Sequence, residues 1–151
     1  MDAEIRIHPR FSSRVDRARL VRTARRTLRV EQARAALTIY VTTDAEIRAL
    51  NLKFHGARAA TDVLSFPMEQ GTDRPRPYIG DVVISYDRAH TQAKAAGWRI
   101  ADELDLLAVH GILHLLGYDD LKPRTRAKMW KRQQEILGPI AGVKGQPIQP
   151  E

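Results

Sequence analysis

The sequence contains no cysteine. This absence excludes disulfide bonds, disulfide-linked partners, thiolate metal sites and a cysteine nucleophile. The chain also has no apolar run near the ~20 residues that a transmembrane helix requires. Its first ten residues, MDAEIRIHPR, lack the apolar core of a signal peptide. We therefore expect a cytoplasmic protein with no membrane partner.

Acidic residues are in deficit, with 18 Asp and Glu against 25 Lys and Arg. The resulting net charge of +7 favours polyanionic partners. Residues 1–34 hold ten arginines and only four acidic residues. A helix expected over residues 14–29, capped by Ser12 or Ser13, would carry most of these arginines opposite an apolar stripe. That arginine face is either a contact surface for nucleic-acid phosphates or an ordinary solvated surface.

The length of 151 residues, 43% of them hydrophobic, suits one domain with a substantial core. Patterns of β-branched and alternating residues predict strands at 4–8, 37–41, 61–67 and 79–85. Helices are expected at 14–29, 44–54 with Asp44 as its cap, 89–96, 102–116 and 123–137. We expect a loop at 69–77 between neighbouring strands. Residues 1–137 would form one domain, and residues 138–151 a flexible tail.

The segment 102–116 is apolar nearly all round, which predicts a central helix covered by a sheet and other helices, in an α/β fold. Residues 110–120 include the end of this helix and read HGILHLLGYDD. His110 and His114 are four apart, so on a helix both imidazoles project from one face about one turn apart. Gly117 can end this helix in the left-handed conformation, which lets a side chain at 119 or 120 reach the same metal.

We predict His110, His114 and Asp120 as ligands of one metal ion. Two imidazoles and a carboxylate suit Zn²⁺ best, with one coordination position open for water; manganese, nickel and iron accept the same ligands. The alternatives are that both histidines are ordinary interior residues, that Asp120 caps the last helix, or that Asp119 takes its place as ligand.

The spacing matches the zinc-peptidase motif HExxHxxGxxH with two substitutions. Gly111 stands where the peptidase has its glutamate base, and Asp120 stands where it has its third histidine. Peptidase chemistry is therefore disfavoured unless another glutamate, such as Glu69 or Glu103, reaches the metal. A carboxylate ligand also makes the metal centre less positive, which predicts a slower or more pH-demanding enzyme.

Three motifs resemble those of a known family. The runs LNLKFHGARAATDVLSFP, IGDVVIS and HGILHLLGYDD are similar to the signatures LNxxYRxxDxxTDVLSFP, GDIVIS and HGxLHLxGYDH of the YbeY family of bacterial rRNA-maturation endoribonucleases. The resemblance covers about residues 35–137. It implies a zinc-dependent, single-strand-specific endoribonuclease that acts in 16S rRNA 3′ end maturation and ribosome quality control. It also implies ribosomal partners, including small-subunit ribosomal proteins, and a central helix flanked by a four-stranded mixed sheet.

The chain departs from these signatures at three positions. Asp120 replaces the third histidine, His55 replaces an arginine, and Arg58 replaces an aspartate. We predict that His55 and Arg58 orient a phosphate while a metal-bound water attacks the phosphodiester. The alternative for Arg58 is that it is an exposed loop residue without a role in binding. No general base is evident, and the RNA 2′-OH is an alternative nucleophile.

Two other functions stay open at this point. One is a non-catalytic ribosome-assembly factor that binds rRNA through the same fold, in which the altered third ligand marks a loss of activity. The other is the metallopeptidase-like hydrolase. Thr61, Asp62 and Ser65, which match the family strand, either line the cleft or only pack.

Overall fold

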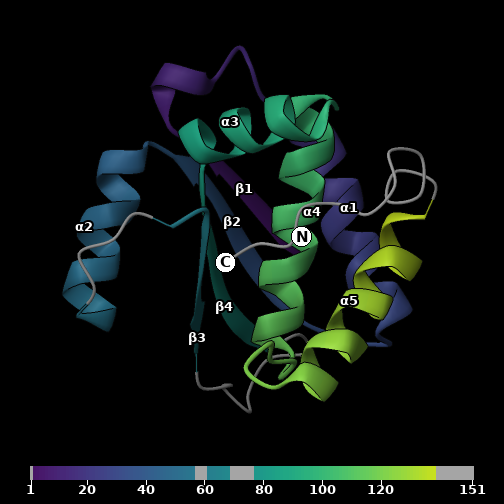
Figure 1. Cartoon of the computed structure of the whole chain (residues 1–151). Coiled ribbons are helices and arrows are strands. Elements are labelled where there is room, and N and C mark those ends of the chain that lie inside the picture. Colours follow the sequence, from purple (N-terminus) through teal and green to yellow (C-terminus); the bar gives the residue numbers. More distant parts are fainter. Residues whose placement is uncertain (1, 57–60, 69–76, 139–151) are drawn as a thin grey trace.

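The computed structural model describes residues 2–56, 61–68 and 77–138. In chain order the elements are β1 (Ala3–Ile7), a 3₁₀ turn (Pro9–Phe11), α1 (Arg17–Val30), β2 (Ala36–Thr42), α2 (Asp44–His55), β3 (Val63–Pro67), β4 (Tyr78–Ser85), α3 (Tyr86–Ala96), α4 (Ile100–Leu115) and α5 (Pro123–Leu137) (Figure 1). All four predicted strands and all five predicted helices are present.

The strands form one mixed sheet in the order β1-β2-β4-β3. β1 pairs with β2, and β2 with β4, in parallel, while β3 runs antiparallel to β4. β3 and β4 are neighbours in space, as the predicted loop between them requires. The α/β class and the four-stranded mixed sheet are therefore confirmed.

The pairing register sends apolar side chains to one face of the sheet. Ile5 lies opposite Ile39, and Ile39 opposite Val82, and all three belong to the main core. Because successive side chains of a strand alternate, their neighbours Arg6 and Tyr40 project to the other face. The alternation of apolar and polar residues in the sequence therefore gives the two faces of the sheet different chemistry.

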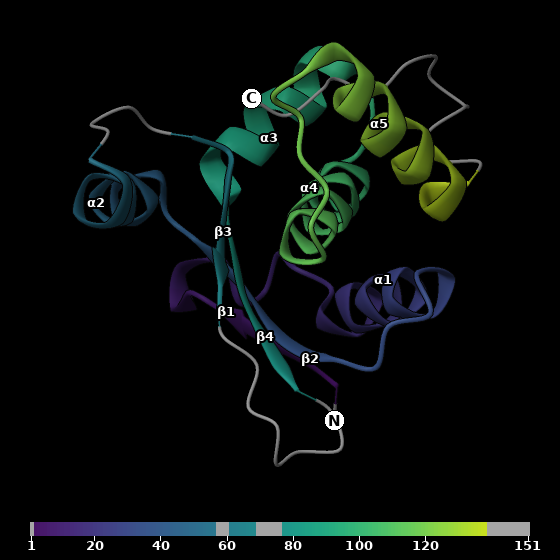
Figure 2. The ribbon, with the colours of Figure 1, turned by 90° about the horizontal axis from the view of Figure 1, so that it is seen from below.

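The layers follow from this asymmetry. Helices α1, α3, α4 and α5 lie on the apolar side of the sheet, and α2 is the one helix of the described residues that lies on the other side (Figure 2). Every residue of α4 from Glu103 to Leu113 is buried, between the sheet and α1 on one side and α3 and α5 on the other. The predicted central helix is thus confirmed.

Helix starts differ from the prediction where a better cap lies nearby. The Asp16 carboxylate, rather than Ser12 or Ser13, accepts a hydrogen bond from the Arg19 amide at 3.1 Å. Ser12 instead ends the 3₁₀ turn Pro9–Phe11. Thr43, rather than Asp44, caps α2 through the amide of Glu46. An aspartate or threonine in extended conformation one residue before the helix satisfies a free N–H group.

Among the described residues, no helix combines the length and apolar content needed to cross a membrane. The predicted tail lies outside the described residues from position 139 onward, as does most of the predicted loop between β3 and β4.

Candidate metal centre

The last two turns of α4 present His110 and His114 to each other. Their Nε2 atoms are 3.1 Å apart, and their rings meet edge to face. The side chain of His110 is 4% exposed and that of His114 is 28% exposed. His110 thus lies in the protein interior, whereas His114 is partly open to solvent.

A turn after α4 brings the third group to this pair. Tyr118 N donates to the carbonyl of Leu113 and Gly117 N to that of His114, which is the Schellman pattern of helix termination. Gly117 has φ of +105°, a conformation that a residue with a side chain rarely adopts. The chain therefore reverses, and Asp120 returns to the histidines.

Asp119 and Asp120 take different roles. Oδ1 of Asp119 accepts from the Leu121 amide at 3.1 Å and from Thr125 Oγ1 at 2.7 Å, so this carboxylate fixes the start of α5. Oδ2 of Asp120 lies 3.5 Å from Nε2 of His110 and 3.7 Å from Nε2 of His114. The geometry thus favours Asp120 over Asp119 as a ligand.

Hydrogen bonds at the far side of each ring fix the imidazole tautomers. Nδ1 of His110 is 2.5 Å from Oε1 of Gln133, and Nδ1 of His114 is 3.0 Å from the Tyr118 carbonyl oxygen. Both oxygens only accept, so both Nδ1 atoms carry the proton and both Nε2 atoms carry a lone pair. Burial also lowers the pKa of His110 to about 4, which keeps this imidazole neutral at pH 7.

Three electron-pair donors therefore converge with no proton between the two imidazoles. His110, His114 and Asp120 form a group that can hold a metal ion. In a tetrahedral zinc site, ligand atoms about 2.05 Å from the ion lie about 3.3 Å from one another. The three separations here, 3.1, 3.5 and 3.7 Å, scatter around that value. The donor set and its spacing fit a divalent metal.

Gly111 has a packing role that explains why no glutamate stands there. A Cβ atom at this position would lie 2.4 Å from Cγ1 of Val82 on β4. The close approach of α4 to the sheet also lets Ser65 Oγ on β3 donate to the Gly111 carbonyl at 2.9 Å. A glutamate at 111 would point into the sheet and away from the metal group. Position 111 therefore cannot supply the glutamate base that a peptidase mechanism needs.

Glu103 does not replace that base. Glu103 is 1% exposed and accepts from Trp98 Nε1 at 2.9 Å. It lies seven residues before His110, about 10 Å along the helix axis. Glu69 lies outside the described residues.

Helix α5 places two cations beside the turn that carries Asp120. Arg126 Nε donates to the Asp120 carbonyl oxygen at 3.1 Å, and Lys128 Nζ lies 5.7 Å from the centroid of the Tyr118 ring. Both residues are exposed. A basic rim therefore borders the three candidate ligands.

A family model described as Endoribonuclease YbeY matches residues 6–141. The chain belongs to the YbeY family. A curated relative of that description from Chloroflexus aggregans is 43% identical over 133 residues, covering 82% of this chain and 86% of its own length. One from Roseiflexus castenholzii is 37% identical over 145 residues and covers 91% of each chain.

Among solved structures, the solution structure of a Thermotoga maritima protein superposes with a TM-score of 0.64. It covers 93% of this chain and 90% of its own, at 23% sequence identity. This likeness shows a shared fold and nothing more.

Of the two residues predicted to orient the phosphate, the structure of this YbeY chain describes only His55, and it places His55 away from the metal group. The ring of His55 stacks on Phe66 with centroids 5.5 Å apart, and its Nδ1 lies 3.2 Å from Asn51 Oδ1. Phe66 packs with α2, on the face of the sheet opposite to α4. Arg58 lies outside the described residues.

Sequence reasoning missed Gln133. Its signal was a polar residue within the apolar stripe of α5, where Met129, Ile136 and Leu137 are buried. Such a residue must find a partner, and here the partner is the ring of His110.

Of the three residues in the family strand, Asp62 is buried and accepts a hydrogen bond from Gln92, so it packs internally.

Proposed function

We propose that this chain is a zinc-dependent endoribonuclease that cleaves single-stranded RNA. It would act in maturation of the 16S rRNA 3′ end and in ribosome quality control, in the cytoplasm, with the ribosome and small-subunit ribosomal proteins as partners. Membership of the YbeY family supports the nuclease activity. The observation that carries the proposal is the convergence of three lone-pair donors, on His110, His114 and Asp120, at one partly open site.

His110, His114 and Asp120 would hold the ion, with Gln133 and the Tyr118 carbonyl orienting the two rings. When bound, zinc would lower the pKa of a coordinated water toward ~7 and stabilise charge on a phosphate oxygen. Because His114 and Asp120 are partly exposed, an RNA phosphate can approach from their side. The carboxylate ligand reduces the positive charge of the centre relative to three imidazoles.

Cations of the chain would hold the RNA backbone. Arg22, Arg26 and Arg29 are exposed on one side of α1 and have no acidic partner among the described residues. α5 packs beside α1, and Gly138 at its end lies next to the Arg26 guanidinium. Together with the basic residues of α5, these arginines form a surface suited to phosphates and not to base reading.

We also propose that His55 and Arg58 contact the substrate, on the basis of their positions in the LNLKFHGAR motif. Arg126 and Lys128 are the cations found beside the Asp120 turn, so they are the second pair to test for phosphate binding. Exchanging each pair for glutamine would separate the two assignments, since the pair that orients the phosphate lowers cleavage more than RNA binding.

The decisive experiment combines metal content with RNA cleavage. Protein purified without added metal should contain about one equivalent of zinc and cleave a labelled single-stranded RNA, but not the same RNA in a duplex. Asp120→Ala should lose the metal and cleavage, by more than the roughly 10–100-fold that loss of an outer-shell partner causes. Asp120→His should keep both. Asp119→Ala is the matched control, and it should keep the metal while losing about 1 kcal/mol of stability with its capping contacts.

An absence of stoichiometric metal in every form would refute the hydrolase mechanism. If such protein still bound single-stranded RNA, the non-catalytic assembly factor would be the better account. The replacement of the third family histidine by Asp120 is the observation that favours this second function.

A further inference from the structure

Glu31 ties the turn that carries Asp120 to α1. This glutamate lies at the C-terminal cap of α1, and its side chain is 11% exposed. Its Oε2 atom accepts a hydrogen bond from the hydroxyl of Tyr118 at 3.0 Å and another from Nε of Arg132 on α5. One carboxylate oxygen therefore joins three segments: the end of α1, the turn after α4, and α5.

Tyr118 connects this contact to the metal group. Its ring packs against the apolar cluster that includes Leu113 and Met129, and its N–H donates to the Leu113 carbonyl at 3.0 Å. Its own carbonyl oxygen accepts the Nδ1 proton of His114 at 3.0 Å. Glu31 thus holds the side chain of the same residue whose backbone orients a candidate ligand.

The position of the Tyr118 carbonyl decides which nitrogen of His114 can bind a metal. A neutral imidazole carries one proton, and only the other ring nitrogen is free to act as a ligand. With the proton on Nδ1, the Nε2 lone pair is directed at His110 and Asp120. Tyr118 lies between α4 and α5, outside any helix or strand. The contacts of its side chain therefore help to determine where its carbonyl points.

We propose that Glu31 is a positioning residue of the metal group. It holds the hydroxyl of Tyr118, so that the Tyr118 carbonyl keeps the proton of His114 on Nδ1. Arg132 fixes the glutamate in turn and balances its charge. Outer-shell partners of this kind set the orientation of a ligand and the affinity for the metal. The inference rests on the proposed function, which makes His114 a metal ligand.

The test measures zinc affinity of the full-length chain by competition with a chelator. Glu31→Ala and Tyr118→Phe should each weaken zinc binding roughly 3–10-fold, less than the ~10–100-fold that loss of a direct partner of a ligand causes. The double variant should lose no more than either single variant, because both changes remove the same hydrogen bond. Glu31→Gln keeps an acceptor for the hydroxyl and should bind zinc like the wild type. Additive losses, or full affinity in Glu31→Ala, would overturn the proposal.

Asp102→Ala is the matched control for a loss of packing between helices. The Asp102 side chain is 14% exposed and accepts from Arg19 at 2.8 Å, so it joins α4 to α1 as Glu31 joins α1 to α5. Its removal should lower stability and leave zinc affinity unchanged. An equal loss of affinity in Asp102→Ala and Glu31→Ala would show a general packing effect and refute a positioning role.

The position of the His114 proton gives a readout that needs no metal. Spectra that correlate ¹H and ¹⁵N in the imidazole rings of metal-free protein distinguish the two tautomers. Glu31→Ala should move part of the His114 proton from Nδ1 to Nε2, whereas His110 should keep its proton on Nδ1 through Gln133. An unchanged His114 ring would overturn the proposal. If the wild type binds no zinc, the proposed function fails, and this tautomer measurement still decides the inference.

Discussion

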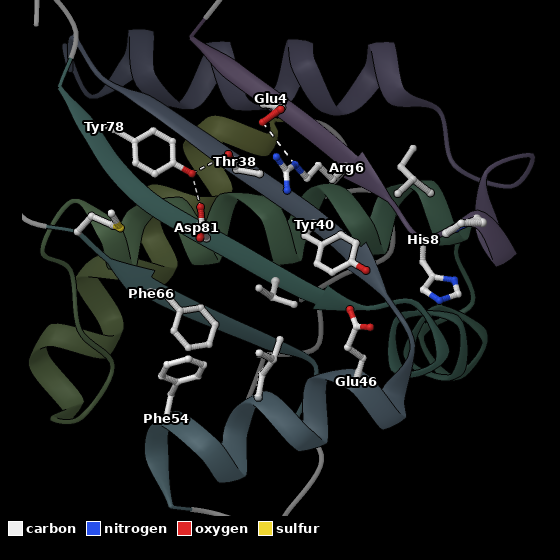
Figure 3. A pocket seen from close by; sticks show the side chains of 15 residues that line it. Glu4, Arg6, His8, Thr38, Tyr40, Glu46, Phe54, Phe66, Tyr78 and Asp81 are labelled. Atoms are coloured by element: carbon white, nitrogen blue, oxygen red, sulfur yellow. Dashed lines mark hydrogen bonds and ion pairs between the residues drawn. The ribbon is translucent and has the colours of Figure 1, made fainter.

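The two faces of the sheet bear opposite kinds of surface. On one face, α4 approaches so closely that position 111 has no space for a side chain, and the metal group forms at the end of that helix. On the other, α2 leaves a groove that is lined by an exposed phenylalanine and by several carboxylates (Figure 3). Because successive side chains point to opposite faces, the same strands contribute to both surfaces. A basic protein can thereby keep an acidic surface apart from the face proposed to bind RNA.

The closeness of α4 to the sheet predicts the largest stability effect. Gly111→Ala should lower the free energy of unfolding by about 3 kcal/mol, because the new Cβ would lie 2.4 Å from Val82 Cγ1. Chemical denaturation of the variant measures this loss. Val82→Ala should restore part of it when combined with Gly111→Ala, although it is destabilising alone. Simple additivity of the two losses would show that α4 and β4 do not compete for this space.

Burial on the closed face also predicts a pH effect. Burial raises the pKa of Glu103 from 4.5 to about 7, with the Trp98 hydrogen bond opposing the shift. The folded state therefore binds this proton more tightly than the unfolded state, so stability is full below about pH 4.5 and falls as pH rises through 7. Glu103→Gln should remove this loss and raise stability at pH 8 by up to about 3 kcal/mol, and by little at pH 4.

Unfolding at several pH values tests this second prediction, with Glu135→Gln as the exposed control on the neighbouring helix. An unchanged pH profile in Glu103→Gln would mean that the carboxyl is solvated and that this face is less closed than the contacts imply.

Most of the fold could be predicted because each element has a local signature. Alternation revealed the strands, and the all-round apolar segment revealed α4, since these patterns depend on nearest neighbours along the chain. The caps at Asp16 and Thr43 were missed because several capping residues stand close together and only tertiary contacts choose between them.

The metal group could be predicted in part for the same reason. His110 and His114 are set by helical spacing, whereas the choice of Asp120 depends on a hydrogen bond from Thr125 that occupies Asp119. Gln133 joins the site from another helix, and no local pattern connects it to His110. The open groove could not be predicted, because the sequence does not say that, of the described helices, only α2 covers that face.

Substitution of Gln133 should have an intermediate effect, on metal affinity, and this effect should be confined to the face of the sheet that carries α4. Gln133→Leu should lower zinc or cobalt affinity by roughly 10–100-fold, because Nδ1 of His110 loses its acceptor. Gln133→Glu should restore the affinity, since a carboxylate accepts the same hydrogen bond. Competition with a chelator measures both values. The groove variant Glu46→Gln/Asp81→Asn should bind metal like the wild type, and a loss there would mean that the two faces are coupled.

The smallest effect is expected where single charges act on RNA. Arg22→Gln/Arg29→Gln removes two exposed cations from α1, so RNA binding should weaken several-fold. The slope of log affinity against log salt should fall by about 1.4, because each lost single-strand phosphate contact contributes about 0.7. The groove variant should leave both values unchanged, since Glu46 and Asp81 line the groove on the face of the sheet opposite to α1 (Figure 3). Titrations of a short single-stranded RNA at several salt concentrations measure the slope. A steeper loss in the groove variant than in the α1 variant would place RNA on the open face and reverse the assignment of the two surfaces.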